Sequence, residues 1–213
     1  MTRLLLVRHG ESVANRQGIF AGYYDAELEE NGRIQAQKTA SYIVNEYQVD
    51  KVYASDLKRA YETGKAVADL AGVEIVAKEG LREIYGGDWE GVPFADLPVL
   101  FPIEYSVWMK EIQNTCCPNG ESIREVGKRI YHTVEEIAKE NKGKTVVIAT
   151  HATPIRVLES MLREGDIENM QSIPWVSNAS VTELSYENGV WEYGKIGYDS
   201  HLEELKTVLP EDI

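Results

Sequence analysis

The chain has 213 residues, of which 43% are hydrophobic and 27% are charged, and these values fit one globular domain over residues 1–213. Its 22 basic and 35 acidic residues give a net charge of −13, which argues against nucleic acid or an anionic membrane surface as a partner. No apolar run reaches the ~20 residues of a membrane span or has the form of a signal peptide, so we expect a cytoplasmic protein.

The first predicted element is a buried strand over residues 4–7, all of them apolar. After a turn predicted at residues 30–32, apolar residues recur every three or four positions up to residue 47, which indicates a helix. Residues 51–55 are typical of the next strand, and residues 57–71 carry a second helical stripe. The first third of the chain therefore alternates strand and helix.

Residues 92–119 are apolar and interrupted by prolines, and we expect them to form a helical insertion on the substrate side of the sheet. Ser122 and Glu125 then form a capping-box pattern at the start of a strongly periodic helix. We expect Gly143 to end that helix.

The last part of the chain begins with a buried strand over residues 144–150. Pro154 suits the first turn of the helix that follows, with Thr153 as its cap. Asn188-Gly189 then predicts a hairpin turn between two further strands. This order of elements predicts an α/β fold, a three-layer α/β/α sandwich whose central sheet is mostly parallel with an antiparallel edge.

The cysteines and two of the histidines give no sign of a functional site. Cys116 and Cys117 are adjacent, so they offer neither a disulfide framework nor metal-ligand spacing. His132 lies off the apolar stripe of its helix, and we expect it at the surface. His201 falls in the final segment, residues 201–213, which we expect to be a loosely held tail or a docking segment.

Three predicted strand ends carry groups that suit an anion: Arg8 with His9, Arg59 one helical turn after the second strand, and His151. In an open α/β sheet, ligands bind outside the carboxyl ends of the strands. Arg59 at a helix N-terminus is disfavoured by ~0.3–1 kcal/mol unless an anion lies beside it. Gly10 is expected to let the backbone turn close to that anion. The alternatives are that Arg59 pairs with a carboxylate and that both histidines are structural.

A phosphoryl group suits this set of residues. It offers faces for arginine forks and a phosphorus that a neutral imidazole can attack, and nearby arginines favour the neutral imidazole. The leaving alkoxide needs a proton from an acid that burial keeps protonated. The acid-rich segment 81–91 offers Glu83, Asp88 and Glu90, and composition does not choose among them.

Five segments in order resemble the motifs of a known family: VRHGES (7–12), ASDLKRAYET (54–63), LREIYGGDWEG (81–91), PNGES (118–122) and VIATHATPIR (147–156). The family is the histidine phosphatase superfamily, in its phosphoglycerate mutase-like branch. The resemblance covers most of the chain. It implies a phosphoglycerate mutase-like fold and a phosphatase that hydrolyses a small-molecule phosphate monoester without a metal or cofactor.

The resemblance also implies a role for six residues of the site. His9 matches the histidine that becomes phosphorylated, and Glu83 matches the proton donor. The resemblance thus selects Glu83 from the three acidic candidates. The remaining four match residues that bind the phosphoryl group: Arg8 and Arg59 as its clamp, His151 as the group that steadies its transfer, and Asn15 as an amide beside it.

Some positions bear on competing interpretations. Ala14 stands where mutases of this branch have tryptophan, and IYGGDWEG looks like the phosphatase version, so a mutase is the alternative. A non-catalytic binding protein on the same fold is the remote alternative. Ala152 replaces the usual glycine, Glu121 with Ser122 is read as mainly structural, and Arg156 has no assigned role. A homodimer through a sheet edge or the tail is a further expectation.

Overall fold

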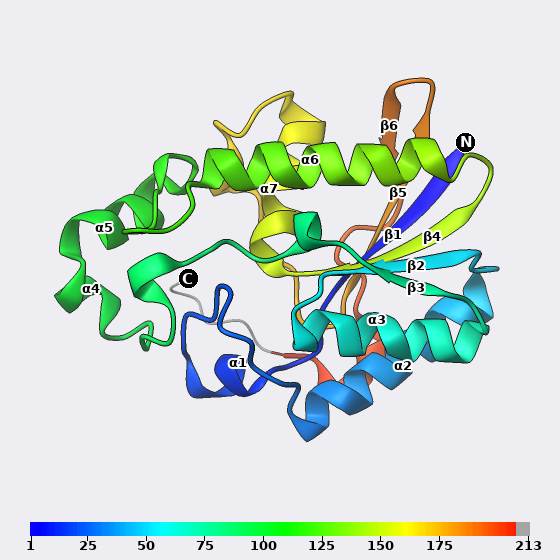
Figure 1. Ribbon diagram of the computed structural model, residues 1–213, viewed down its shortest axis with the longest axis horizontal. Coiled ribbons are helices and arrows are strands. Elements are labelled where there is room, and N and C mark those ends of the chain that lie inside the picture. The colour runs from blue at the N-terminus through cyan, green and yellow to red at the C-terminus, as the bar shows by residue number, and fades with distance from the viewer. Residues whose placement is uncertain (208–213) are drawn as a thin grey trace.

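A computed structural model describes residues 1–207, apart from the side chain at position 164, and its strands form one mixed sheet of six (Figure 1). The strand order is β3-β2-β4-β1-β5-β6. The parallel strands are β1 (Thr2–Arg8), β4 (Thr145–Thr150), β2 (Lys51–Ala54) and β3 (Ile75–Ala77). The antiparallel edge is the hairpin of β5 (Val181–Glu187) and β6 (Val190–Tyr193). The predicted mostly parallel sheet with an antiparallel edge is confirmed.

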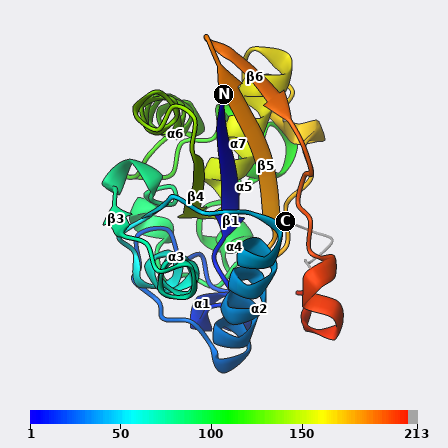
Figure 2. The same cartoon turned by 90° about the vertical axis from the view of Figure 1, so that its right-hand side faces the viewer.

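Helices cover both faces of this sheet (Figures 1 and 2). On one face lie α2 (Glu30–Glu46) and α3 (Lys58–Ala71), and on the other lie α6 (Ile123–Glu140) and α7 (Ala152–Glu164). The short helices α1 (Val13–Gln17), α4 (Leu97–Leu100) and α5 (Pro102–Lys110) lie beyond the carboxyl ends of the parallel strands (Figure 1). The short 3₁₀ turns are η1 (Glu79–Leu81), η2 (Gly87–Trp89), η3 (Ile112–Asn114), η4 (Met170–Ser172) and η5 (Ser200–Leu205). The three-layer sandwich is confirmed.

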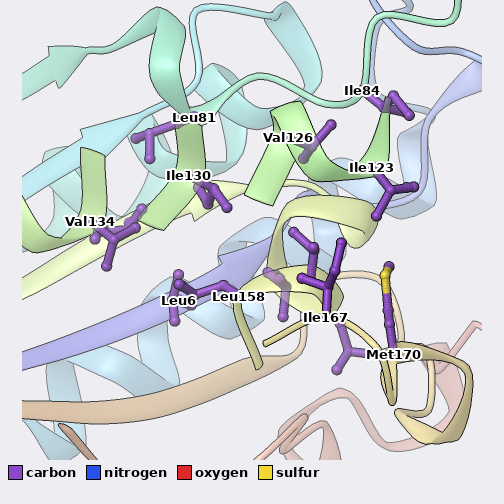
Figure 3. Close-up of a cluster of buried hydrophobic side chains, with 14 of the residues drawn as sticks. Leu6, Leu81, Ile84, Ile123, Val126, Ile130, Val134, Leu158, Ile167 and Met170 are labelled. Carbon is purple, nitrogen blue, oxygen red and sulfur yellow. The ribbon is translucent and has the colours of Figure 1, made fainter. Parts of the chain in front are cut away.

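Strand β1 divides the hydrophobic core in two because successive side chains of a strand point to opposite faces. Leu4 and Leu6 pack with the buried residues of α6 and α7, whereas Leu5 and Val7 pack with those of α2 and α3. Figure 3 shows Ile130 of α6 pointing toward the layer that carries Leu6. Burying one such side chain contributes about 1.5–3 kcal/mol, so both helix layers hold β1 firmly in place.

The same core anchors the loop that carries Glu83. Leu81 and Ile84, on either side of it, are 0% and 1% exposed and belong to the α6/α7 side of the core (Figure 3). Hydrophobic packing therefore fixes the backbone on both sides of the acid.

Two helix starts differ from the prediction. Helix α2 already begins at Glu30, so Gly32 lies in its first turn. That turn packs closely against the loop after β1: a Cβ on Gly32 would lie 2.0 Å from the carbonyl oxygen of Glu11. The glycine thus serves a close approach and not a turn. Helix α7 is capped by His151 with extended backbone, and Thr153 lies inside its first turn.

Part of the predicted tail docks on α2. The Gln35 amide donates to the carbonyl of Leu205 at 2.7 Å, and His201 stacks on Tyr42 with ring centroids 4.8 Å apart. Residues 208–213, the rest of that tail, lie outside the described residues. Across residues 1–207, no helix is long and apolar enough to span a bilayer.

Candidate active site

The carboxyl ends of β1, β4 and β2 meet at one edge of the sheet, as predicted. Arg8 pairs in register with Thr150, so the next residues of these two strands, His9 and His151, become neighbours. Their ring centroids are 5.1 Å apart at an angle of 62°. Ser55 follows β2 and places its hydroxyl 2.9 Å from Nε2 of His151. The sheet topology therefore joins residues that are far apart in the chain.

His9 is held in a form suited to nucleophilic attack. Its Nδ1 lies 2.7 Å from the carbonyl oxygen of Gly10, and because a carbonyl only accepts, Nδ1 carries the proton and Nε2 keeps its lone pair. Burial lowers the pKa of His9 well below the ordinary value, and the charges of Arg59 and Arg8 lower it further. The ring is therefore neutral at neutral pH.

The backbone around His9 is fixed from two directions. Asn178 donates its side-chain amide to the carbonyl of His9 at 3.0 Å. On the other side, a Cβ on Gly10 would lie 2.3 Å from the carbonyl oxygen of Gly32. Gly10 is thus required for the contact with the first turn of α2, a different reason from the predicted turn beside an anion.

Arg8 and Arg59 are buried cations, and the part of the chain that the structure describes supplies neither with a counterion. Arg8 donates to the carbonyl of Val176 at 2.5 Å, and Arg59 donates to the carbonyls of Tyr24 and Gly22 at 3.0 and 2.8 Å. Among the described residues, neither arginine forms an ion pair, and the Nε of each is buried without a hydrogen-bond partner. The alternative in which Arg59 pairs with a carboxylate is therefore wrong for this structure.

An unpaired buried charge is costly, so this arrangement favours an anionic ligand that supplies the missing charge. Burial lowers the pKa of Arg8 to about 10, which leaves the group cationic at neutral pH, and burial also lowers the pKa of Arg59. Two cations beside a neutral imidazole are the chemical environment that a phosphoryl group requires.

Of the three acidic candidates, Glu83 alone lines the pocket that contains His9. Asp88 is exposed and accepts a hydrogen bond from Asn119 at 2.9 Å. Glu90 accepts from the backbone N–H of Tyr23 at 2.7 Å and so supports the loop. The geometry thus leaves one acid in a position to exchange a proton with a ligand.

Arg129 of α6 supports the backbone of Glu83 from behind. Its guanidinium donates to the carbonyls of Gly80, Arg82 and Glu83 at 3.1, 2.8 and 3.1 Å. It also pairs with Glu121 through two hydrogen bonds of 3.0 and 2.8 Å. Sequence reasoning missed Arg129, which lies in no recognised motif, whereas it correctly read Glu121 as structural.

Asn15 lies at the pocket with its amide orientation fixed. Its Oδ1 accepts hydrogen bonds from the backbone N–H of Ser12 at 3.1 Å and from Asn178 at 3.2 Å. Because the oxygen is occupied, the amide nitrogen is the group that can donate to a ligand. Asn178 was also missed, since nothing in its local sequence points to a role.

His151 lies beside His9 but not at the surface of the pocket. Its ring is 0% exposed and is absent from the pocket lining. Burial and the charge of Arg59 lower its pKa well below the ordinary value, and its Nδ1 has no hydrogen-bond partner among the described residues. Ser55, at the end of the second strand, lies at hydrogen-bond distance from the other ring nitrogen; the sequence placed it at this edge of the sheet without assigning it a role.

The pocket is lined by both polar and apolar side chains, and it holds about 710 Å3 of empty space, including the part open to solvent. The polar lining includes Arg8, His9, Asn15, Arg59 and Glu83. The larger apolar side chains of the lining are Ile19, Phe20, Ile84, Phe94, Trp108 and Trp175. Among the described side chains, no three of His, Cys, Asp or Glu are grouped to hold a metal ion.

Comparison with known proteins identifies one family and several similar chains. The sequence model of the family described as "Histidine phosphatase superfamily (branch 1)" matches residues 4–199. Phosphoserine phosphatase 1 of Hydrogenobacter thermophilus is 30% identical over 205 residues, which cover 96% of this chain and 96% of that protein.

Two solved structures are similar over nearly the whole chain. YhfR of Bacillus stearothermophilus has a TM-score of 0.90 at 28% identity, covering 95% of this chain and 100% of that one. Mycobacterial glucosyl-3-phosphoglycerate phosphatase Rv2419c with VO3 has a TM-score of 0.82 at 28% identity, covering 92% of this chain and 99% of that one.

Proposed function

Because the chain belongs to the histidine phosphatase superfamily and is a phosphatase, we propose that it hydrolyses phosphate monoesters of small molecules through a phosphohistidine on His9. One observation carries the proposal: Arg8 and Arg59 are buried beside a neutral His9, and neither has a carboxylate partner within residues 1–207. The names of the relatives support small phosphorylated molecules as substrates.

The first step transfers the phosphoryl group to the enzyme. The lone pair on Nε2 of His9 attacks phosphorus, and the bond from phosphorus to the substrate oxygen breaks. Glu83 gives its proton to the departing alkoxide, so the alcohol leaves neutral. Arg8 and Arg59 bind the phosphoryl oxygens, and each preorganised donor of this kind can stabilise the transition state by about 2.7–4 kcal/mol.

The second step returns the enzyme to its starting state. Glu83, now a carboxylate, takes a proton from a water molecule as that water attacks phosphorus. The bond between phosphorus and Nε2 breaks, inorganic phosphate leaves, and His9 is again neutral with its proton on Nδ1. The hydrogen bond from Nδ1 to Gly10 persists through both steps and keeps Nε2 directed at phosphorus.

His151 and Asn15 have supporting roles in this scheme. The Nδ1 of His151 is buried without a hydrogen-bond partner among the described residues, and it would donate to the phosphoryl group once that group is bonded to the adjacent His9. For Nδ1 to donate, it must carry the ring proton, and Nε2 of His151 must then accept a hydrogen bond from the hydroxyl of Ser55. The amide nitrogen of Asn15 donates to a further phosphoryl oxygen.

The test is to trap the intermediate. The wild type is mixed with a phosphate-labelled aryl phosphate and quenched in alkali, and we expect the label on the peptide that contains His9. His9→Ala should lose both label and turnover, whereas His132→Ala, at an exposed histidine of α6, should keep both. Turnover that survives in His9→Ala would overturn the mechanism. Interconversion of the two phosphoglycerates with added bisphosphoglycerate, faster than phosphate release, would favour the mutase alternative.

A further inference from the structure

Four of the side chains that line the pocket are aromatic, Phe20, Phe94, Trp108 and Trp175, and we call this group the aromatic wall. These residues come from three separate parts of the chain: the loop after α1, the segment around α4 and α5, and the loop before β5. They face the same pocket as His9 and Glu83. An alcohol group bonded to a phosphoryl group at His9 would share this pocket with the four aromatic side chains.

The rings of the aromatic wall pack on one another. Phe20 lies 5.5 Å from Phe94 and 5.7 Å from Trp108 between ring centroids. Trp108 stacks on Trp175 at 6.0 Å with an angle of 23°. Trp89, which is 0% exposed, supports both Phe20 and Trp108 from the core at 5.3 and 5.8 Å. Such mutual packing keeps the wall in place before a ligand binds.

A third arginine close to the site is not available to a substrate. Arg156, which the sequence left without a role, lies with its guanidinium carbon 4.2 Å from the centre of the Trp175 ring. It donates to the carbonyls of Ile173 and Gln171 at 2.6 and 3.2 Å and does not line the pocket. Its charge thus supports Trp175 by a cation–π contact.

Among the residues that the structure describes, the arginine and carboxyl side chains that line the pocket are those of Arg8, Arg59 and Glu83. Both arginines are committed to the phosphoryl oxygens in the proposed reaction. A carboxylate on the substrate would lie against aromatic rings, without a cation to pair with and near Glu83. Burying an unpaired charge in such surroundings carries a large free-energy cost.

We propose that the substrates of this enzyme are phosphate monoesters of uncharged alcohols with an apolar, preferably planar group, and that the aromatic wall excludes monoesters that carry a carboxylate. This inference rests on the proposed function and names the substrate class of the same site. The aromatic wall offers apolar contact to an uncharged alcohol, and it offers no cation to pair with a carboxylate.

The test uses two substrates that differ in charge and little in shape, 4-methylbenzyl phosphate and 4-carboxybenzyl phosphate. The methyl and carboxylate groups lie far from the reacting oxygen, so the two benzyl alcohols leave with similar ease. We expect kcat/KM to be at least about tenfold higher for the methyl compound, mainly through KM. The measurement is the release of inorganic phosphate by the wild type.

A variant that adds a positive charge to the aromatic wall tests whether the wall itself causes the substrate preference. Phe94→Lys places a cation at a half-buried position of the pocket, and we expect it to reduce the preference for the methyl compound by about tenfold. Phe101→Lys is the matched control, because Phe101 is also half-buried in the same segment but does not line the pocket. It should leave the preference unchanged.

The outcomes separate this inference from the proposed function. If the wild type hydrolyses both compounds equally, or prefers the carboxylate, and His9→Ala abolishes both activities, the inference is overturned and the proposed function stands. If neither these compounds nor a generic aryl phosphate shows hydrolysis that depends on His9, the proposed function fails and the inference fails with it.

Discussion

Arg129 and Glu121 form a two-point ion pair directly behind the loop that carries the proposed proton donor. Two nitrogens of the guanidinium meet the two carboxylate oxygens at 3.0 and 2.8 Å, and the pair is mostly shielded from solvent. The same guanidinium binds the carbonyl of Glu83. An arginine fork can make all of these hydrogen bonds at once, and a lysine cannot.

Arg129→Lys should therefore lower kcat by about tenfold to a hundredfold while KM changes little, because it displaces the proton donor and leaves the phosphate clamp in place. Arg124→Lys is the control, since Arg124 lies on the same helix in an exposed pair with Glu168 at 2.7 Å. Steady-state kinetics on an aryl phosphate measure both constants. An unchanged kcat, or a loss confined to KM, would show that Arg129 does not position Glu83.

Arg59→Lys should weaken the binding of inorganic phosphate and lower kcat/KM by about a hundredfold or more, because it removes the guanidinium fork that is proposed to bind the phosphoryl oxygens. The wild type should gain about 2.7 kcal/mol of stability at a phosphate concentration one hundred times its Kd, and the variant should gain much less at that concentration. Thermal unfolding with and without phosphate measures this difference. Arg33→Lys, at an exposed pair with Glu62, should behave as the wild type.

The free energy of unfolding should fall as the pH falls below about 6.5, the ordinary pKa of histidine. The pKa of His9 and that of His151 are lowered in the folded protein, mainly by burial, so below that pH the unfolded chain binds protons that the folded chain does not. Each such histidine contributes a slope of about 1.4 kcal/mol per pH unit. Stability thus rises with pH through this window.

Denaturant unfolding at several pH values tests this dependence. His9→Asn should remove about one histidine's share of the slope, whereas His132→Asn, at an exposed position, should keep the wild-type slope. Equal slopes in all three proteins would mean that His9 is protonated in the folded state.

Gly32→Ala should destabilise the protein by at least about 1–3 kcal/mol and reduce kcat, because its Cβ would meet the backbone oxygen of Glu11 at 2.0 Å. The displaced loop leads directly to His9. Gly127→Ala is the matched control in another helix, where the nearest atom is the flexible Met161 sulfur at 3.2 Å. That change should be neutral or stabilising by up to about 1 kcal/mol. Thermal unfolding and steady-state kinetics measure the stability and kcat of both variants, and equal values for the two would contradict the prediction.

The fold and most residues of the candidate site could be predicted from the sequence, because both depend on local patterns. The apolar run before Arg8, the capping box at Ser122 and the turn at Asn188-Gly189 each specify a strand or helix boundary through contacts of a few residues. His9 and His151 each follow a predicted strand, and because parallel strands end at one edge of the sheet, the two residues were expected to be neighbours.

Some residues of the site could not be found this way because their partners are distant in the chain. Arg129 and Asn178 act on Glu83 and His9 through backbone carbonyls, which every residue has, so no side-chain motif marks the contact. The glycine at position 32 read as a turn because its real constraint, the Glu11 oxygen, lies in another segment.

The character of the pocket was decided only in the tertiary structure. Sequence patterns identify aromatic residues such as Phe20, Phe94, Trp108 and Trp175, but not that three separate segments bring them together against one cavity. Equally, the sequence offers Arg156 as one more cation near a catalytic motif, and only packing turns it away onto Trp175. Local patterns therefore identified the residues proposed to bind the phosphoryl group, and long-range packing decided which other side chains line the same pocket.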